Sequence, residues 1–431
     1  MKKLFFLLSG MFALTLNAQP LLTPDEAVRI ALENNYDIRI LRGDAEVARL
    51  NNTKGNAGML PNVNFVVGDN AGLNAFQQQN LADGRVIEAY GRLNNNLNAG
   101  IQLNWTLFDG GRMQIGKKRL EELEALGQIN LKGAVQQTTA EVLQGYFGIV
   151  YSRLLERSTQ EVITLNEERL RIAEARLAAG FAAQTDALQA RIDLNQQRSN
   201  LLALQTATAA AKRNLNQRLA RAADTPFAVE ENLANAYTPD RARLLENLLR
   251  QNPQLVSLQK SAEVAALTAQ ENQRLNRPRI AANGQLTAQR TDNGAGFLLN
   301  NTQAGLVVGA TMTIPLYTGG NNQRLRDVAR IGAEQAVTRV EAQRLGAETQ
   351  LDNQLAFFQT QQQVLLLEQD NVKNARESLN VSTERFRLGQ TNALEVQSAQ
   401  NALEQALLRQ NVVMYNLKTA ELELRLLAGE L

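Results

Sequence analysis

The chain has 431 residues and contains neither cysteine nor histidine. These absences exclude disulfide bonds, Ser-His-Asp and Cys-His catalysis, and the metal sites that histidine or cysteine ligands build. The formal net charge is only +2, so the charge balance does not indicate a nucleic-acid partner. We expect a protein that is not an enzyme and that holds neither a metal nor another cofactor.

The N-terminus has the pattern of a signal peptide over residues 1–18. Lys2 and Lys3 precede a mostly apolar run, Leu4–Leu16, and Ala18 is a small residue suited to cleavage. The run is too short to span a membrane as a helix, which takes about 20 residues. Removing the two lysines would leave equal numbers of basic and acidic residues in an exported chain.

The remainder of the chain contains one pattern twice. Pro61 recurs 217 residues later as Pro278, and Gly180 recurs 209 residues later as Gly389. Such self-similarity at matched spacing indicates two copies of one structural unit. The predicted boundaries are 19–220 for the first repeat, 221–239 for an equatorial connector and 240–431 for the second repeat.

Each repeat is expected to begin with a helix. Residues 23–59 open with Thr23, which can cap, Pro24, which suits the first helical position, and Glu26, which completes a capping box. The equivalent helix of the second repeat is expected at 240–276.

Two strands follow in each repeat, and their signal is an alternation of apolar and polar residues. One face of the clearest run carries these side chains: Leu97, Ala99, Ile101, Leu103, Trp105 and Leu107. A period of two gives one apolar and one polar face, which fits either a soluble sheet on a core or a membrane barrel with a wet interior. The expected strands are 61–70 and 97–108 in the first repeat, and 279–290 and 303–317 in the second.

The number of strands constrains the assembly. Lipid does not tolerate an unpaired sheet edge, and four strands are too few to close a barrel. If the strands span a membrane, several chains must share one barrel, with twelve strands from three chains or eight from two. The segments 71–96 and 291–302 are rich in Asn, Gln and Gly and are expected to be surface loops.

A proline-free stretch follows each pair of strands and predicts a long helix, at 112–179 and 321–388. Each stretch carries an apolar lane at intervals of seven residues, which predicts coiled-coil packing. The lanes are Val142, Ile149, Glu156, Ile163, Leu170 and Leu177 in the first repeat, with Glu156 as the exception, and Leu351, Phe358, Leu365, Val372, Leu379 and Phe386 in the second. An ordinary two-stranded coiled coil is the simpler alternative.

Shorter helices are expected to return from each long helix, at 181–220 and 391–429. The lengths of the short helices suggest that 181–220 stacks end to end on 240–276, and that 23–59 stacks on 391–429. Each stacked pair would then be about as long as one long helix.

Several short motifs, in order and in both repeats, resemble the TolC-type outer-membrane efflux family over essentially the whole mature chain. They are Leu22-Thr23-Pro24-Asp25-Glu26-Ala27, Glu33-Asn34-Asn35, Leu60-Pro61, Trp105-Thr106-Leu107-Phe108-Asp109-Gly110-Gly111, Ile314-Pro315-Leu316-Tyr317-Thr318-Gly319-Gly320, Gly180-x5-Asp186 and Gly389-x5-Glu395. The resemblance implies a mostly α fold with two tandem repeats and long periplasmic α-helical hairpins that form an α-barrel. Four strands per chain would contribute to a 12-stranded β-barrel shared by a trimer.

The resemblance also implies a function and partners. The homotrimer would sit in outer-membrane lipid of a Gram-negative cell and reach into the periplasm. There it would meet a periplasmic adaptor protein and an inner-membrane transporter of the RND, ABC or MFS type. Its function would be the exit duct of a tripartite efflux or type I secretion system, carrying small molecules or proteins. The alternative is a structural or surface coiled-coil protein without transport activity.

Glycines mark the joints of the expected fold. Gly180 and Gly389 each end a long helix, as a C-terminal glycine does, and by resemblance lie at the hairpin turns. The pairs Gly110–Gly111 and Gly319–Gly320 lie where a strand passes into a helix. They lack the GxxxxGK[ST] form of a phosphate loop, and glycine there serves the turn.

By resemblance, the hairpin ends also carry the functional residues. Glu395 would line the channel constriction together with Asp186, where focused negative charge attracts cations. Thr185 and Asp186 would accept the contacts that hold the gate shut. The partner side of these gate contacts departs from the family pattern, because Phe386 stands where a tyrosine is typical and Thr391 where an arginine can occur. The nearby Arg385 and Arg387 are the candidate substitutes.

Overall fold

The computed structural model describes residues 20–80, 82–233, 236–295 and 299–431, so the predicted signal peptide lies outside the described residues. The chain folds into two compact units. The first comprises the chain up to Ile40, Lys132–Asn252 and Leu345–Leu431; the second comprises Leu41–Leu131 and Pro253–Arg344. Both units take segments from both repeats, because the two longest helices contribute to each of them.

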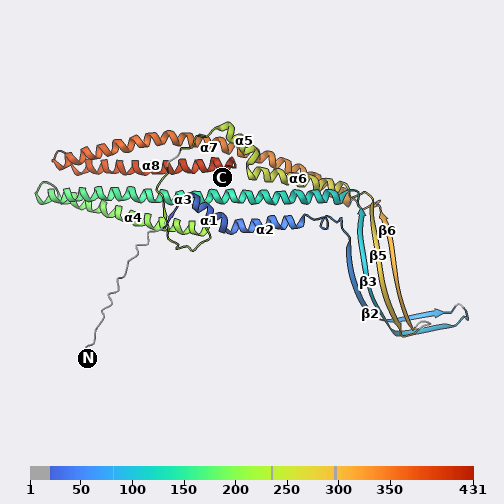
Figure 1. The fold of residues 1–431 in the computed structure, drawn as a ribbon. Coiled ribbons are helices and arrows are strands. Elements are labelled where there is room, and N and C mark those ends of the chain that lie inside the picture. The colour runs from blue at the N-terminus through green and yellow to red at the C-terminus, as the bar shows by residue number, and fades with distance from the viewer. Residues whose placement is uncertain (1–19, 81, 234–235, 296–298) are drawn as a thin grey trace, which may run out of the picture. The chain divides into compact units, whose positions relative to one another are not determined.

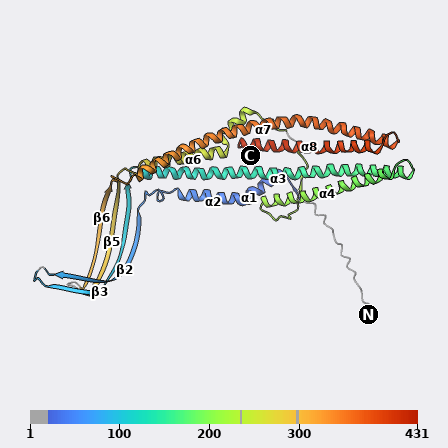
Figure 2. The same ribbon diagram turned by 180° about the vertical axis from the view of Figure 1, so that it is seen from behind.

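Two helical hairpins dominate the first unit (Figure 1). In each hairpin, a long helix is followed by a shorter antiparallel helix, and the view from behind shows the same pairing (Figure 2). The helices are α3 (Arg112–Ala178) with α4 (Gln184–Arg218), and α7 (Asn321–Arg387) with α8 (Ala393–Leu427). The mostly helical fold with two tandem repeats is confirmed.

The seven-residue lanes lie in the interior of the first unit. Val142, Ile149, Leu351 and Phe358 are fully buried. The polar exception, Glu156, is also buried, and its carboxylate accepts hydrogen bonds from Arg153 at 2.6 Å and from the Thr208 hydroxyl. Because both carboxylate oxygens are bonded, the charge interrupts the apolar lane without being left unsatisfied.

The short helices are interrupted, and the prediction of continuous helices at 23–59 and 240–276 is wrong. The observed helices are α1 (Pro24–Asn34), α2 (Tyr36–Asn51), α5 (Arg241–Gln251) and α6 (Pro253–Gln273). Each break falls at an asparagine with extended backbone, Asn35 (ψ 133°) in the first repeat and Asn252 (ψ 114°) in the second. The Asn35 side-chain oxygen accepts from the backbone N–H of Asp37 at 2.9 Å and so starts α2 afresh.

The same two asparagines fix which helices meet end to end. Asn35 donates from its side chain to the carbonyl of Arg218, the last residue of α4, at 3.0 Å. Asn252 donates in the same way to Leu427, the last residue of α8, also at 3.0 Å. Each break therefore meets the returning helix of its own repeat, so the predicted end-to-end pairing of 181–220 with 240–276, and of 23–59 with 391–429, is wrong.

The start of α1 forms as predicted in two respects, and the capping box is the third, which does not form. Thr23 caps the helix, since its hydroxyl accepts from the backbone N–H of Glu26 at 3.2 Å, and Pro24 is the first helical residue. The Glu26 carboxylate does not return to Thr23 but binds Arg29 at 2.6 Å, one turn along the helix. Just before Thr23, a short strand β1 (Leu21–Leu22) pairs in parallel with β4 (Ala228–Val229) of the connector.

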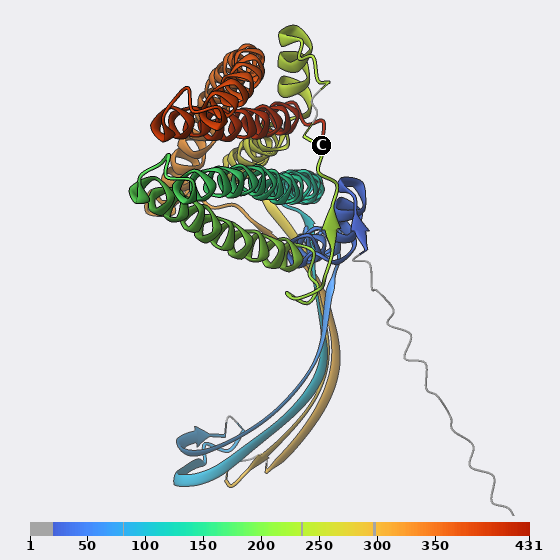
Figure 3. The same ribbon diagram turned by 90° about the vertical axis from the view of Figure 1, so that its left-hand side faces the viewer.

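The second unit carries an antiparallel four-stranded sheet in the order β2-β3-β5-β6. The strands are β2 (Asn62–Gln79), β3 (Val86–Phe108), β5 (Arg279–Asn293) and β6 (Asn300–Thr313). Figure 3 shows the four strands curving together as one bent sheet. The order leaves β2 and β6 as edge strands.

The strand limits differ from those predicted. Most of the segment 71–96 is not a loop. Strands β2 and β3 continue beyond the predicted limits, 70 and 97, and pair as far as Gln79 with Val86. Apolar residues such as Leu73, Val86 and Ile87 lie in this extension, but they do not alternate strictly with polar ones, so the alternation used for the prediction is missing there. At the other end, β6 stops at Thr313 rather than at 317, because Pro315 cannot donate to a sheet.

Candidate functional site

The free end of each hairpin is closed by a glycine in the left-handed region. Gly180 has φ +74° and Gly389 has φ +75°. The residue after each glycine donates its N–H back to the long helix, Phe181 to Arg176 and Gln390 to Arg385, both at 2.8 Å. This is the Schellman ending, in which a residue with a Cβ would be strained.

The carboxylate of Glu395 is bound by side chains of the second hairpin. Glu395 lies in the first turn of α8, where its N–H donates to the side chain of Asn392 at 3.0 Å. Its carboxylate forms an ion pair with Arg385 of α7 at 2.7 Å and accepts from the hydroxyl of Thr391. The positive charge of Arg385 therefore offsets the negative charge of Glu395.

Asp186 occupies the equivalent place in the first turn of α4, with a different environment. Ala183 precedes that helix and makes no side-chain cap, and the Thr185 side chain is exposed. Within the described part of the chain, the Asp186 carboxylate forms no ion pair. The structure therefore brings neither Arg385 nor Arg387 to Asp186.

The contact between the two hairpins near their ends depends on Phe386. Its side chain is only 2% exposed and packs with Leu379, Val396 and other residues of the α7–α8 interior. Arg176 of α3 stacks on the ring, with its guanidinium carbon 4.6 Å from the ring centroid, and donates to the Phe386 carbonyl. One arginine thus binds both the backbone and the ring of the other hairpin.

Arg387 supplies a second link between the hairpins. Its guanidinium lies 3.3 Å from the carboxylate of Glu168 on α3, and also 3.3 Å from Glu384 within α7. The Glu168 pKa is lowered, first by the hydrogen bond from Arg171 and then by Arg387. Sequence reasoning missed Arg176 and Glu168, because the packing of α3 against α7 leaves no local signal in either helix.

A buried polar cluster joins three helices further along the hairpins. Arg169 of α3 is 5% exposed; it pairs with Asp193 of α4 and donates to Gln400 of α8 at 2.8 Å. Gln397 of α8 also donates to Asp193, at 2.9 Å. Because every member is bonded, the cluster fixes the position of α8 against the first hairpin without a buried unpaired charge.

The glycine pairs lie at the joints between strands and long helices. Gly110 and Gly111 have φ of +77° and +92°, and Gly319 and Gly320 have +60° and +77°. At Gly110 a Cβ would come within 2.2 Å of Arg277, so this joint has no room for a side chain.

One face of the four-stranded sheet is apolar and exposed. Cross-strand partners on this face include Phe65 with Ile101 and Leu286 with Leu306. Phe65 is 71% and Leu306 69% exposed, so no part of the described chain covers them. The opposite face carries Asn64, Gln102, Gln285 and similar side chains. Among the described residues, no helix combines the length and apolar character needed to cross a membrane.

The sequence matches a known protein family and two curated relatives. The family model described as outer membrane efflux protein matches residues 27–221 and 244–430. A curated relative, the outer membrane efflux protein BepC of Brucella suis, is 24% identical over 306 residues, which are 70% of this chain and 66% of BepC. The cobalt-zinc-cadmium resistance protein CzcC of Cupriavidus metallidurans is 25% identical over 317 residues, 72% of this chain and 71% of CzcC.

A solved structure shares the fold. The outer membrane protein VceC from Vibrio cholerae superposes with a TM-score of 0.80 at 15% identity, covering 94% of this chain and 96% of VceC. The match extends over helices and strands alike, while the chain spans about two thirds of the length of the curated relatives.

Proposed function

Since the chain belongs to the outer membrane efflux protein family, we propose that three copies of it form a water-filled exit duct through the outer membrane. The observation that supports this best is the four-stranded sheet with one exposed apolar face and two free edges, β2 and β6. In lipid, both the apolar face and the free edges require a closed barrel built from several chains.

The number of copies follows from the width of the barrel. Two chains would give eight strands, and a barrel of about eight strands has an interior that side chains fill. Three chains give twelve strands and are the smallest symmetric assembly that leaves an aqueous interior. The polar face with Asn64, Gln102 and Gln285 would then line the water.

The hairpin ends suit a periplasmic partner. Phe181 in the first turn and Leu394 at the start of α8 are 76% and 69% exposed, and Leu388 in the second turn is 68% exposed. Exposed large apolar residues at a free end are typical of a protein-binding surface. We propose that a periplasmic adaptor and an inner-membrane transporter dock there.

In this proposal, Glu395 and Asp186 lie at the narrowest part of the duct, and Arg176, Phe386 and Arg387 hold the hairpins of one chain together. Cargo passes without covalent chemistry. Opening requires the hairpins to separate near their ends, which first breaks the contacts of Arg176 and Arg387.

Conductance in a planar lipid bilayer tests the function. The purified protein is expected to give discrete, ion-conducting steps that are absent when the same detergent alone is added. A protein that inserts but never conducts, or that stays in the aqueous phase, would favour a structural coiled-coil role and contradict the duct.

A further inference from the structure

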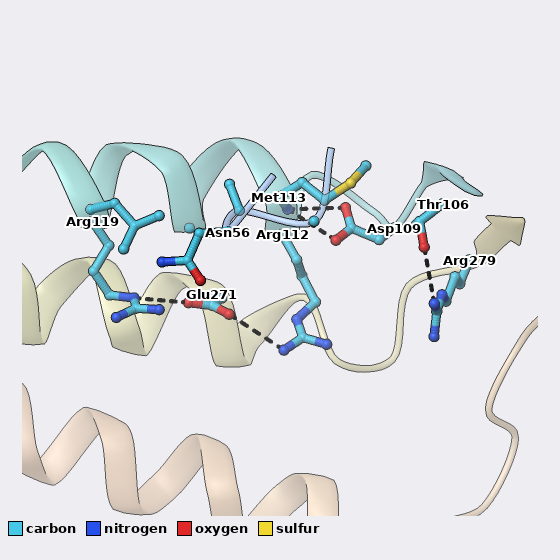
Figure 4. Close-up of a pocket in the computed structure, with 12 residues that line it drawn as sticks. Asn56, Thr106, Asp109, Arg112, Met113, Arg119, Glu271 and Arg279 are labelled. Atoms are coloured by element: carbon cyan, nitrogen blue, oxygen red, sulfur yellow. Dashed lines mark hydrogen bonds and ion pairs between the residues drawn. The ribbon is translucent and has the colours of Figure 1, made fainter. Parts of the chain in front are cut away.

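A polar pocket of about 340 Å³ lies in the second unit, where β3 passes into α3. Its walls come from α3, α6, the ends of β3 and β5, and the segment that follows α2. Pockets of roughly this volume are large enough for small ligands. Figure 4 shows arginine side chains from two sides of this pocket.

Arg112 and Arg119 lie two turns apart on one face of α3. Both reach toward Glu271 of α6: Arg112 Nη2 lies 3.4 Å from one carboxylate oxygen, and Arg119 Nε lies 3.2 Å from the other. One carboxylate is therefore shared by two guanidinium groups at long distances. Arg112 Nε is buried and has no hydrogen-bond partner among the described residues.

The third arginine, unlike the first two, is not paired with an acid in the described chain. Arg279, the first residue of β5, donates to the hydroxyl of Thr106 at 2.9 Å (Figure 4). The second acid of the pocket, Asp109, is occupied elsewhere, since both its oxygens accept from the N–H of Met113 at the start of α3. Three guanidinium groups thus face two carboxylates, one of which caps a helix.

The fold does not require these arginines. By the spacing that relates the repeats, Asn321 stands where Arg112 stands, Val328 where Arg119 stands, and Asn62 where Arg279 stands. At each of these three positions, the other repeat therefore carries a neutral side chain. The arginines therefore serve something other than the joint itself.

We propose that this pocket binds an oxyanion of the phosphate class. Guanidinium groups match the geometry of such oxygens and donate to them in pairs, and Arg112 and Arg119 hold their shared carboxylate only at 3.4 and 3.2 Å. Thr106 and Arg279 belong to the polar face of the sheet, so the pocket opens on the face that also carries Gln102 and Gln285. The oxyanion can come from a dissolved phosphate or from a lipid headgroup.

Equilibrium binding to the full-length, detergent-purified protein tests the site. Isothermal titration with inorganic pyrophosphate at low salt probes a dissolved oxyanion, and retention of phosphatidylglycerol from mixed micelles probes a headgroup. The variant Arg112→Asn with Arg279→Asn gives each position the asparagine found at the equivalent place in the other repeat, Asn321 and Asn62, and keeps the Arg119–Glu271 pair. Arg330→Gln, an exposed arginine of α7 paired with Glu334, is the matched control.

Wild type and the control are expected to bind pyrophosphate, phosphatidylglycerol or both, and the double variant at least about tenfold more weakly, with an unchanged thermal midpoint. Pyrophosphate alone identifies a dissolved ligand, and phosphatidylglycerol alone identifies a headgroup. The proposal is overturned if wild type binds neither, or if the double variant binds as tightly as wild type.

A consequence for transport rests on the proposed duct. In a planar bilayer, pyrophosphate added to the wild type should reduce the current, and it should do so less in the double variant. If the wild type does not conduct, the proposed duct is contradicted, and the binding measurements still test the proposed oxyanion site. If the wild type conducts and the double variant binds as tightly as the wild type, only the oxyanion site is contradicted.

Discussion

The two hairpin ends occupy equivalent places in the repeats and differ in how they hold their acids. Glu395 in the second hairpin is tied to Arg385 and Thr391, whereas Asp186 in the first forms no ion pair in the described part of the chain. The backbone is nearly the same at both ends, with a glycine turn and an acid in the first turn of the returning helix. Shared geometry therefore does not give shared electrostatics.

The apolar residues at the two ends differ in the same sense. Phe386 of the second hairpin is buried and receives Arg176 from the first hairpin, while Phe181 of the first hairpin is exposed. Within the described chain, the acid and the aromatic ring of the second end are thus both bound, whereas the acid of the first end has no ion pair and its ring is exposed. The variants below test this difference, from the largest expected effect to the smallest.

Replacing the buried aromatic should have the largest effect. Phe386→Ala removes a ring packed among Leu379 and Val396 and should lower the unfolding free energy by about 3–5 kcal/mol. Phe181→Ala is the control and should change it by less than about 0.5 kcal/mol, because that ring is exposed. Thermal unfolding of the detergent-solubilised protein measures both; equal shifts would mean that the two ends do not differ in packing.

Arg176→Gln should have the next largest effect. It leaves the Phe386 carbonyl without its charged donor and removes the stacked cation, at a cost of about 1–3 kcal/mol. The thermal midpoint should fall and the single-channel conductance should rise, because the two hairpins lose this link. Arg191→Gln breaks an ion pair with Glu174 inside one hairpin and is the control. Equal conductance changes in the two variants would show that the Arg176–Phe386 contact does not hold the channel closed.

Arg385→Gln and Glu395→Gln should change ion selectivity in opposite directions. Both partners are substantially exposed, so the pair contributes at most about 1 kcal/mol to stability and folding should be unaffected. Arg385→Gln exposes the carboxylate and should increase cation preference, whereas Glu395→Gln should decrease it. Reversal potentials in a salt gradient measure both; if neither variant shifts the reversal potential, Glu395 does not line the narrow part of the duct.

The smallest expected effect is on acid stability. The hydrogen bond from Arg171, with help from Arg387, holds the Glu168 pKa below its ordinary value of 4.5. A depressed folded-state pKa contributes stability above pH 4.5, and that contribution is lost as the pH falls through the folded pKa. As the pH is lowered from 5, the thermal midpoint of the wild type should therefore fall further than that of Glu168→Gln. Glu174→Gln serves as the control and should follow the wild type.

Features that depend only on neighbouring residues in the sequence were predictable. The alternation in 97–108, the apolar lanes and the glycines that end α3 and α7 each follow from one local rule: the pleat, the heptad or a positive φ. The repeat spacing was equally informative, because it relates Asn35 to Asn252. Pro253 at the start of α6 is the signal that could have revealed both helix breaks, since proline favours a first helical position.

Features that depend on contacts between distant segments were not predictable. Arg176 meets Phe386 across 210 positions of sequence, and Arg169 meets Gln400 across 231. Nothing in the neighbourhood of any of these residues identifies the partner. The extension of β2 and β3 beyond 70 was missed for a different reason, because apolar and polar residues do not alternate there, and strands are recognised by that alternation.

The central claim, that three chains close one barrel through β2 and β6, can be tested by cross-linking, because the chain has no natural cysteine. Asn64→Cys on β2 combined with Val307→Cys on β6 puts one thiol on the polar side of each free edge. With a bifunctional thiol reagent in intact outer membranes, the account predicts covalent dimers and trimers and nothing larger, with no trimer from Asn64→Cys alone. A ladder that ends at the dimer, or no cross-linking from any pair of positions along these two edges, would contradict it.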